Sequence, residues 1–368
     1  MRRAEVRRAG ARVWLAVALA AGLVGCGPEG DSGERSASDD PLPRRAGTLV
    51  IDTCPMDSFQ RATLASAATR AVVDEVVLLC LYGRDTGSLG PDAAEPRQWL
   101  SDDIQRAKDA GYRVTLGLTV GDGPISWYGT QRSTELLQQE AWRASIVSGV
   151  QAWLPAVDGV EVALPAPLAN EARAGVNALV KELGAVVRPA GTLGLFVPPS
   201  LRSPSDLPGG DAYDLSTLAP GLDRVRVMTL DWSCCSRPGG PSTDAAWAAE
   251  AVDFAGRLAP GLARSVTMPL FGTDFGDKGS RSVTFVEASG LAQVHGAHVE
   301  RTVSGVPHFG YTDGDGLQHD VWYDDVLSTE LTLGVWASTL PADVGVLYYG
   351  LGAEDPGLWS GLARSMAR

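Results

Sequence analysis

Short apolar runs alternate with amphipathic stretches along the chain from Gly47 onward. The runs are nearly continuous, which is typical of strands covered by helices on both faces. The expected strands are Thr48–Asp52, Glu75–Tyr82, Arg113–Val120, Gly159–Leu164, Thr192–Val197, Arg224–Leu230, Ser265–Phe271 and Val344–Tyr349. The expected helices are Arg61–Val73, Gln98–Ala110, Thr134–Leu154, Ala169–Val187, Thr243–Leu258 and Tyr323–Leu340, with shorter ones near Tyr213–Ala219 and Gly357–Met366.

Eight such strand and helix units predict an α/β protein of the (β/α)8 TIM-barrel class. A doubly wound open sheet is the alternative, although no Gly-rich dinucleotide-binding turn follows the first strand. The segment 276–322, between the seventh and eighth strands, is much longer than one helix. It contains strand-like pieces at Ser282–Val286 and His298–Val303, so we expect a small β-rich insertion there.

The first 46 residues do not follow this pattern. Five Arg residues precede the apolar run Val13–Gly25, which is shorter than the roughly 20 residues that span a bilayer, so residues 1–25 are expected to be a signal peptide. Leu23–Cys26 resembles the lipobox of bacterial lipoproteins, with a plain secretory signal as the alternative. Residues 26–46 predict a lipidated Cys26 and a flexible tether, followed by one folded domain over 47–368. We therefore expect export and attachment to the bacterial cell envelope through lipid.

Composition narrows the chemistry further. The chain is 45% apolar and 20% charged, which excludes disorder throughout, and its net charge of −13 argues against a nucleic-acid-binding surface. Cys54, Cys80, Cys234 and Cys235 lack zinc-site spacing. Cys54 and Cys80 fall at neighbouring strand ends, where a disulfide is plausible. Cys234 and Cys235 are either free thiols or a vicinal bridge.

All four histidines fall in the expected insertion. His295 and His298 are three residues apart, which on a strand places them on opposite faces, so we interpret them as surface residues and not as metal ligands. Asp313–Gly316 lacks the spacing of a calcium loop and predicts a hairpin turn. We expect no metal and no cofactor.

Five segments resemble motifs of glycoside hydrolase family 18, the chitinases and their relatives. Asp158–Pro167 (DGVEVALPAP) resembles the fourth-strand signature D-G-apolar-D-apolar-D-x-E. The sixth-strand motif M-x-Y-D and the seventh-strand motif G-x-P-x-Y-G have counterparts, as does the stretch that leads into and forms the eighth strand. These counterparts are Arg226–Trp232, Thr267–Gly272, Val321–Asp325 and Gly345–Tyr349. The resemblance covers residues 47–368.

The resemblance implies retaining, substrate-assisted hydrolysis, in which the final Glu of the fourth-strand motif protonates the leaving oxygen. This chain has Pro165 at that position, Ala163 at the nearer supporting Asp and Glu161 at the deeper one. Glu161 lies roughly 13 Å below position 165 along a strand and cannot replace the acid. Leu230 stands where the family has the Tyr that contacts the acetamide group. Ordinary chitinase activity is therefore not expected.

Other residues are candidates for holding a ligand. Asp231 is retained, and Trp232, Trp127 and Tyr349 lie near strand ends where they can stack on sugar rings, or pack beneath the insertion instead. Asp52 and Asp274 also follow strands as possible carboxylates or as solvated loop residues. Asp158 is interpreted as a turn residue, and Glu161 as a buried acid that needs a partner.

Three functions remain open on these observations. The first is a surface-tethered barrel that binds N-acetylglucosamine-containing glycans, such as chitin or peptidoglycan fragments, without ordinary hydrolysis. The second is an active glycosidase that uses a displaced carboxylate such as Asp231 or Asp274. The third is a structural or protein-binding barrel.

Overall fold

The computed structural model describes residues 41–91, 98–122, 129–164, 168, 170–201, 212–233 and 238–367. Eight parallel strands close into a barrel, because the first strand pairs with both the second and the last barrel strand. The barrel strands, in spatial order, are β1 (Gly47–Ile51), β14 (Gly345–Tyr349), β8 (Ala263–Pro269), β7 (Arg224–Val227), β6 (Thr192–Val197), β5 (Gly159–Val162), β4 (Arg113–Val120) and β2 (Glu75–Gly83), with the short β3 (Leu89–Gly90) beside the end of β2. The expected barrel class is confirmed, and the open-sheet alternative is wrong.

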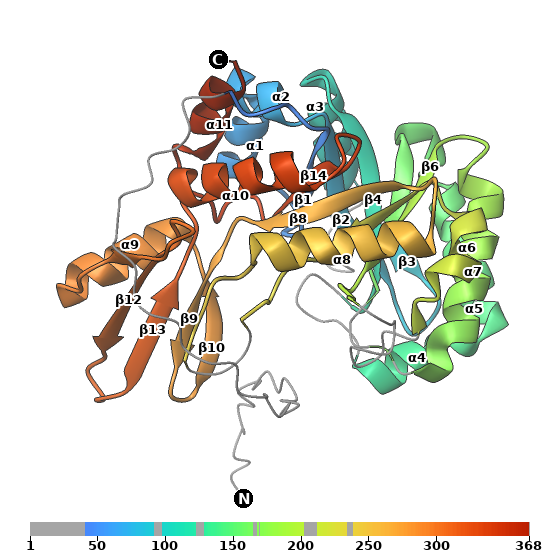
Figure 1. Ribbon diagram of the computed structural model, residues 1–368. Coiled ribbons are helices and arrows are strands. Elements are labelled where there is room, and N and C mark those ends of the chain that lie inside the picture. Colours follow the sequence, from blue (N-terminus) through green and yellow to red (C-terminus); the bar gives the residue numbers. More distant parts are fainter. Residues whose placement is uncertain are drawn as a thin grey trace, which may run out of the picture.

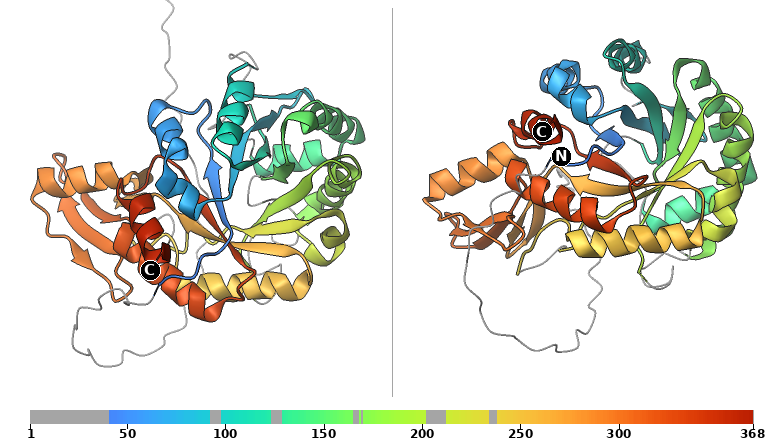
Figure 2. Two further views of the ribbon diagram at one scale, coloured as in Figure 1. Left: turned by 90° about the horizontal axis from the view of Figure 1, so that it is seen from above. Right: turned by 45° about the horizontal axis from the view of Figure 1, so that its top comes forward.

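Helices surround the barrel and bury the outward-facing side chains of its strands in one large apolar core (Figure 1, Figure 2). They are α1 (Ser58–Ala65), α2 (Ala67–Val72), α3 (Gln98–Asp109), α4 (Thr130–Gln138), α5 (Glu140–Gln151), α6 (Arg173–Val187), α7 (Leu215–Leu218), α8 (Ala245–Leu258), α10 (Val326–Thr339) and α11 (Leu358–Ala367). The last helix, α11, lies beside α2 and completes the ring. Among the described residues, no helix is both long and apolar enough to cross a membrane.

Two expected helices are each divided in two. The expected helix Arg61–Val73 is interrupted at Ser66, which has an extended backbone and accepts a hydrogen bond from the Thr69 amide, capping α2. The expected helix Thr134–Leu154 is interrupted at Gln139, whose extended backbone ends α4 and precedes α5 without a side-chain cap. The periodic pattern continues across both breaks because the apolar faces of the paired helices cover the same barrel.

A five-stranded antiparallel sheet follows β8 and projects from one side of the barrel (orange in Figure 1). It begins at Gly272, four positions before the expected boundary, and Asp313–Gly316 forms the predicted hairpin turn. The expected strand Ser282–Val286 is wrong at its end, because Thr284 caps a helix with Glu287 in a capping box. The insertion consists of β9 (Gly272–Gly276), β10 (Gly279–Val283), α9 (Phe285–His295), β11 (Glu300–Arg301), β12 (Pro307–Thr312) and β13 (Gln318–Trp322).

A layer of charged side chains fills the lower part of the barrel interior. Arg226 contacts Glu161 at 3.0 Å and Glu75 at 2.9 Å through the same nitrogen, Nη2. Arg224 contacts Glu75 at 2.6 Å. Burial raises the pKa of Glu75, but the charges of Arg226 and Arg224 outweigh it and hold the pKa below the ordinary value. Gly194 provides the room, because a Cβ at this position would collide with the Glu161 carboxylate. The predicted partner of Glu161 is thus confirmed.

Removal of one charge from this layer leaves the others uncompensated. We expect Arg226→Met to lower the free energy of unfolding by roughly 3–5 kcal/mol, because Glu161 and Glu75 would stay buried with too few partners. Urea unfolding followed by circular dichroism measures the change. The control is Arg257→Met, which breaks an exposed pair with Asp253 and should cost less than about 1 kcal/mol. Equal losses in both variants would contradict the interpretation.

Asp324 lies between β13 and α10, and its pKa is shifted in the opposite direction from that of Glu75. One of its oxygens accepts a hydrogen bond from the Ser328 hydroxyl at 2.8 Å. Burial raises the pKa of Asp324 from 3.8 to about 6, with a smaller contribution from the neighbouring charge of Asp325. Because the folded pKa lies above the unfolded value, ionisation of Asp324 destabilises the fold as the pH rises from about 4 to about 6, and the cost is constant above that.

Asp324→Asn should therefore stabilise the protein in a pH-dependent way. The amide keeps an oxygen for Ser328 and removes the charge, so the gain should reach up to about 3 kcal/mol at pH 8 and about 1 kcal/mol at pH 4.5. Chemical denaturation at the two pH values provides the measurement. Asp315→Asn, in the exposed hairpin turn, removes the same charge as a control. A gain that does not change with pH would show that Asp324 is not the titrating group.

Candidate functional site

The carboxyl ends of the barrel strands form a mouth above the charged layer, and Asp52 and Tyr349 lie within it. Val50 is opposite Tyr349 in the register of β1 and β14, and Asp52 follows Val50 by two positions, so it faces the interior too. The Tyr349 hydroxyl donates a hydrogen bond to the Asp52 carboxylate. Burial raises the pKa of Asp52, and a backbone hydrogen bond and the bond from Tyr349 partly oppose the rise.

Asp231 lies at the same mouth, four residues beyond the end of β7. Its φ of 60° is in the left-handed region, which Asp tolerates better than most residues. Water reaches this side chain, and desolvation by the surrounding protein raises its pKa. The pKa of Tyr349 is raised first by its own burial and then by the negative charges of Asp52 and Asp231. Two carboxyl groups therefore act on one phenol.

The floor of the mouth is apolar. Ala163 and Phe196 are buried in a cluster inside the barrel, and Met228 and Tyr349 pack on it while remaining partly accessible. Ala163 occupies the position of the nearer supporting Asp in the family motif, so a methyl group replaces a carboxylate in this floor. The floor therefore offers hydrocarbon and the aromatic rings of Phe196 and Tyr349.

Trp232 lies on the rim. Its ring is 5.0 Å from that of Trp247, at the start of α8, and 48% of its surface is exposed. The Trp232 amide donates to the Ser242 carbonyl, which fixes the turn after β7. Trp232 is thus adjacent to Asp231 in sequence but leans outward toward α8 and leaves one part of the ring free.

A bulge in β2 brings Tyr82 into the mouth. The register with β4 shifts between Leu78 and Leu81, so Tyr82 lies opposite Thr119 and faces the interior, near Tyr349. Cys80, within this bulge, forms a disulfide with Cys54 in the loop after Asp52. The disulfide considered from the sequence is therefore present, and it links the strand ends that carry Asp52 and Tyr82.

Several sequence-based candidates lie elsewhere. Glu161 belongs to the charged layer, and Asp158 accepts a hydrogen bond from the Val114 amide at 2.8 Å, at the opposite end of the strands. Asp274 was expected at a strand end or in a solvated loop, and this is wrong. Further candidates, namely Trp127, Pro165, Cys234, Cys235 and Cys26, fall outside the described residues.

Asp274 is buried in β9 of the insertion. Its carboxylate is 2.7 Å from His319 Nδ1, 3.2 Å from the Tyr311 hydroxyl and 3.2 Å from Arg281. The rings of His319 and His295 each stack on the Tyr311 ring, at 4.5 Å and 4.3 Å between ring centres. These contacts hold the insertion together. In the part of the chain that is described, no group of three or more His, Cys, Asp or Glu residues is arranged to hold a metal.

The other face of the insertion meets the loop after β7. Gly239 donates its amide to Asp320 at 2.9 Å, and a Cβ at Gly239 would collide with Phe275 and Trp322. The Trp322 ring stacks on His308 at 4.1 Å. The sheet is therefore packed against the same loop that begins with Asp231 and Trp232, which places the insertion beside the mouth.

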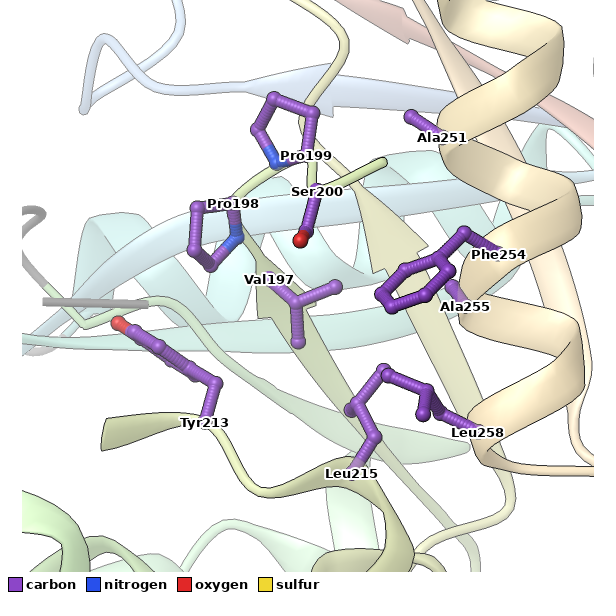
Figure 3. A pocket seen from close by; sticks show the side chains of 10 residues that line it. All are labelled: Val197, Pro198, Pro199, Ser200, Tyr213, Leu215, Ala251, Phe254, Ala255 and Leu258. Carbon is purple, nitrogen blue, oxygen red and sulfur yellow. The ribbon is translucent and has the colours of Figure 1, made fainter. Parts of the chain in front are cut away.

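A separate small pocket lies outside the barrel, between the end of β6, α7 and α8 (Figure 3). Pro198, Tyr213 and Phe254 are among its mostly apolar lining residues, and burial raises the pKa of Tyr213. None of the mouth residues Asp52, Asp231 or Tyr349 lines it. We therefore treat the barrel mouth, and not this pocket, as the candidate site.

This chain is more similar to known proteins in its fold than in its sequence. No family model matches the chain. The cortical fragment-lytic enzyme of Bacillus anthracis is 23% identical over 156 residues, which is 40% of this chain and 36% of that enzyme. The matched segment thus spans about a third of the length of this curated relative.

Solved structures match nearly the whole barrel. A chitinase from Chromobacterium violaceum has a TM-score of 0.73 at 18% identity, covering 88% of this chain and 99% of its own. A chitinase-like agglutinin from Robinia pseudoacacia has a TM-score of 0.63 at 15% identity, covering 87% and 99%. The chain therefore has the fold of the chitinase-like TIM barrels that its sequence motifs resemble.

Proposed function

We propose that this protein binds N-acetylglucosamine-containing glycans, such as chitin or peptidoglycan fragments, at the barrel mouth without ordinary chitinase activity. The observation that carries the proposal is the mouth itself, where an accessible Tyr349 ring and an apolar floor lie between the carboxyl groups of Asp52 and Asp231. Sugars bind such surfaces through ring stacking and a few polar contacts. One protein with this fold is named an agglutinin, which is a precedent for a binding role.

The absence of hydrolysis follows from the sequence at the acid position. Pro165 has no proton to donate, and Ala163 removes the neighbouring carboxylate that would support an acid there. General acid catalysis accounts for a factor of about 10² to 10⁴ in rate. Glu161 cannot take over, because it is held in the charged layer by Arg224 and Arg226.

A glycosidase with a displaced acid is the second candidate. Burial raises the pKa values of Asp52 and Asp231, and a raised pKa suits a carboxyl group that must donate a proton near neutral pH. Asp274 does not share this role, since it is paired with His319 and Arg281 inside the insertion. A structural or protein-binding barrel is the remaining alternative, and it predicts no sugar binding at all.

We expect weak binding and no turnover of N-acetylglucosamine oligomers. The dissociation constant should lie between roughly 10 µM and 1 mM, about 4 to 7 kcal/mol, by isothermal titration calorimetry. Products should be absent by mass spectrometry after prolonged incubation. Turnover that disappears in Asp231→Ala would favour the displaced-acid glycosidase, and no binding of any N-acetylated glycan would favour the structural barrel.

Trp232 provides a test of the rim. Trp232→Ala should weaken binding of the same oligomers by about 1 kcal/mol or more, the scale of one aromatic contact. Trp232→Phe retains a ring against Trp247 and should recover most of the affinity. If Ala and Phe variants both bind like the natural protein, sugar does not contact this ring.

We also propose that the domain is exported and lipid-anchored to the bacterial cell envelope through Cys26. The lipobox-like Leu23–Cys26 and the Gly- and Ser-rich residues 27–40 support this proposal. The expected tether is too long at its end, because the Leu42 amide donates to the Ser365 carbonyl and the buried Arg45 donates to carbonyls at the end of α10. Metabolic labelling with a radioactive fatty acid should label the natural protein, and Cys26→Ser should abolish the label. Label that persists in the Ser variant would exclude this site of attachment.

A further inference from the structure

The chemistry of the mouth also bears on which sugars it prefers. Asp231 carries a carboxyl group that water reaches, and among the described residues no hydrogen-bond or ion-pair partner contacts it. Asp52 is partnered by the Tyr349 hydroxyl, a neutral donor. The largest charge effects on Tyr349 come from these two aspartates, with a smaller one from Tyr82. The mouth thus has negative charge that its described neighbours leave uncompensated.

The groups that would hold an acetamide are missing in the same place. Ala163 contributes a methyl group to the floor, where the resemblance implies a carboxylate, and Leu230 in the sequence directly before Asp231 has no hydrogen-bonding group in its side chain. An N-acetyl group needs a donor for its carbonyl and an acceptor for its amide, and it leaves one unpaired if either is absent. An ammonium group needs only acceptors, and a carboxylate accepts from it in a charge-assisted hydrogen bond that also favours the ionised form of the acid.

We propose that the mouth prefers glucosamine-containing glycans with free amino groups over fully N-acetylated ones, with Asp231 and Asp52 as the residues that set this preference. The inference rests on the proposed function, since it assumes that sugar enters the mouth. The ammonium group lies against the Asp231 carboxylate, and Tyr349 and the apolar floor contact the ring.

Calorimetry with a glucosamine pentamer and an N-acetylglucosamine pentamer tests this preference. We expect the free amine to bind at least tenfold more tightly at pH 6 and low salt. Asp231→Asn and Asp52→Asn should each lower affinity for the glucosamine pentamer at least fivefold, and by a larger factor than they lower affinity for the acetylated pentamer. Asp231→Asn is the primary variant because its side chain is exposed; circular dichroism checks that Asp52→Asn folds, since it alters the contact with Tyr349.

General attraction to an acidic protein must be separated from recognition, because the chain has a net charge of −13. Asp315→Asn removes the same charge in the exposed hairpin turn and should leave affinity for the glucosamine pentamer unchanged. Pentalysine should not compete for the site at equal charge. Equal loss in Asp315→Asn, or full competition by pentalysine, would overturn the proposal.

The outcomes separate the two proposals. Binding of the acetylated pentamer equal to or tighter than that of the free amine overturns the preference and leaves the glycan-binding function intact. Absence of binding by both pentamers overturns the proposed function itself. Preference for the free amine that is lost in Asp231→Asn and retained in Asp315→Asn supports both.

Discussion

The ion pairs inside the barrel constrain everything above them. Arg226 donates to Glu75, Glu161, Thr48 and Ser265, which come from four different strands, so one guanidinium connects much of the barrel circumference. Charges at this depth persist only when they are paired. An apolar layer that includes Phe196 then separates them from the mouth. Glu161, which falls within the segment that resembles a catalytic motif, is therefore structural here. Any binding of a ligand depends on residues at the strand ends.

The barrel could be predicted from the sequence because its strands are buried on both faces and stand out as apolar runs. The elements of the insertion were harder to predict from the sequence. Helix α9 exposes Val286 and Val294, which are 63% and 80% accessible, so its pattern lacks the contrast between polar and apolar faces that marks a surface helix. Its capping box, Thr284 with Glu287, was the available signal.

The candidate site was only partly predictable for a geometric reason. Asp231 and Tyr349 could be identified because they fall within recognisable motifs. The hydrogen bond between Tyr349 and Asp52 depends on the register of the first and last barrel strands, which a local pattern does not contain. Tyr82 was missed because the bulge in β2 shifts the alternation by one residue. Asp274 was assigned to the wrong environment because β9 continues directly into a second sheet.

The disulfide between Cys54 and Cys80 has a consequence for the entropy of association. It joins the segment after Asp52 to the strand that carries Tyr82, so two walls of the mouth hold their relative positions before any ligand arrives. Ordering of loops and side chains on binding normally subtracts from affinity. A mouth that folding has already fixed loses less conformational freedom when a ligand enters, so fewer contacts would be needed for the proposed binding on a floor that offers few hydrogen bonds.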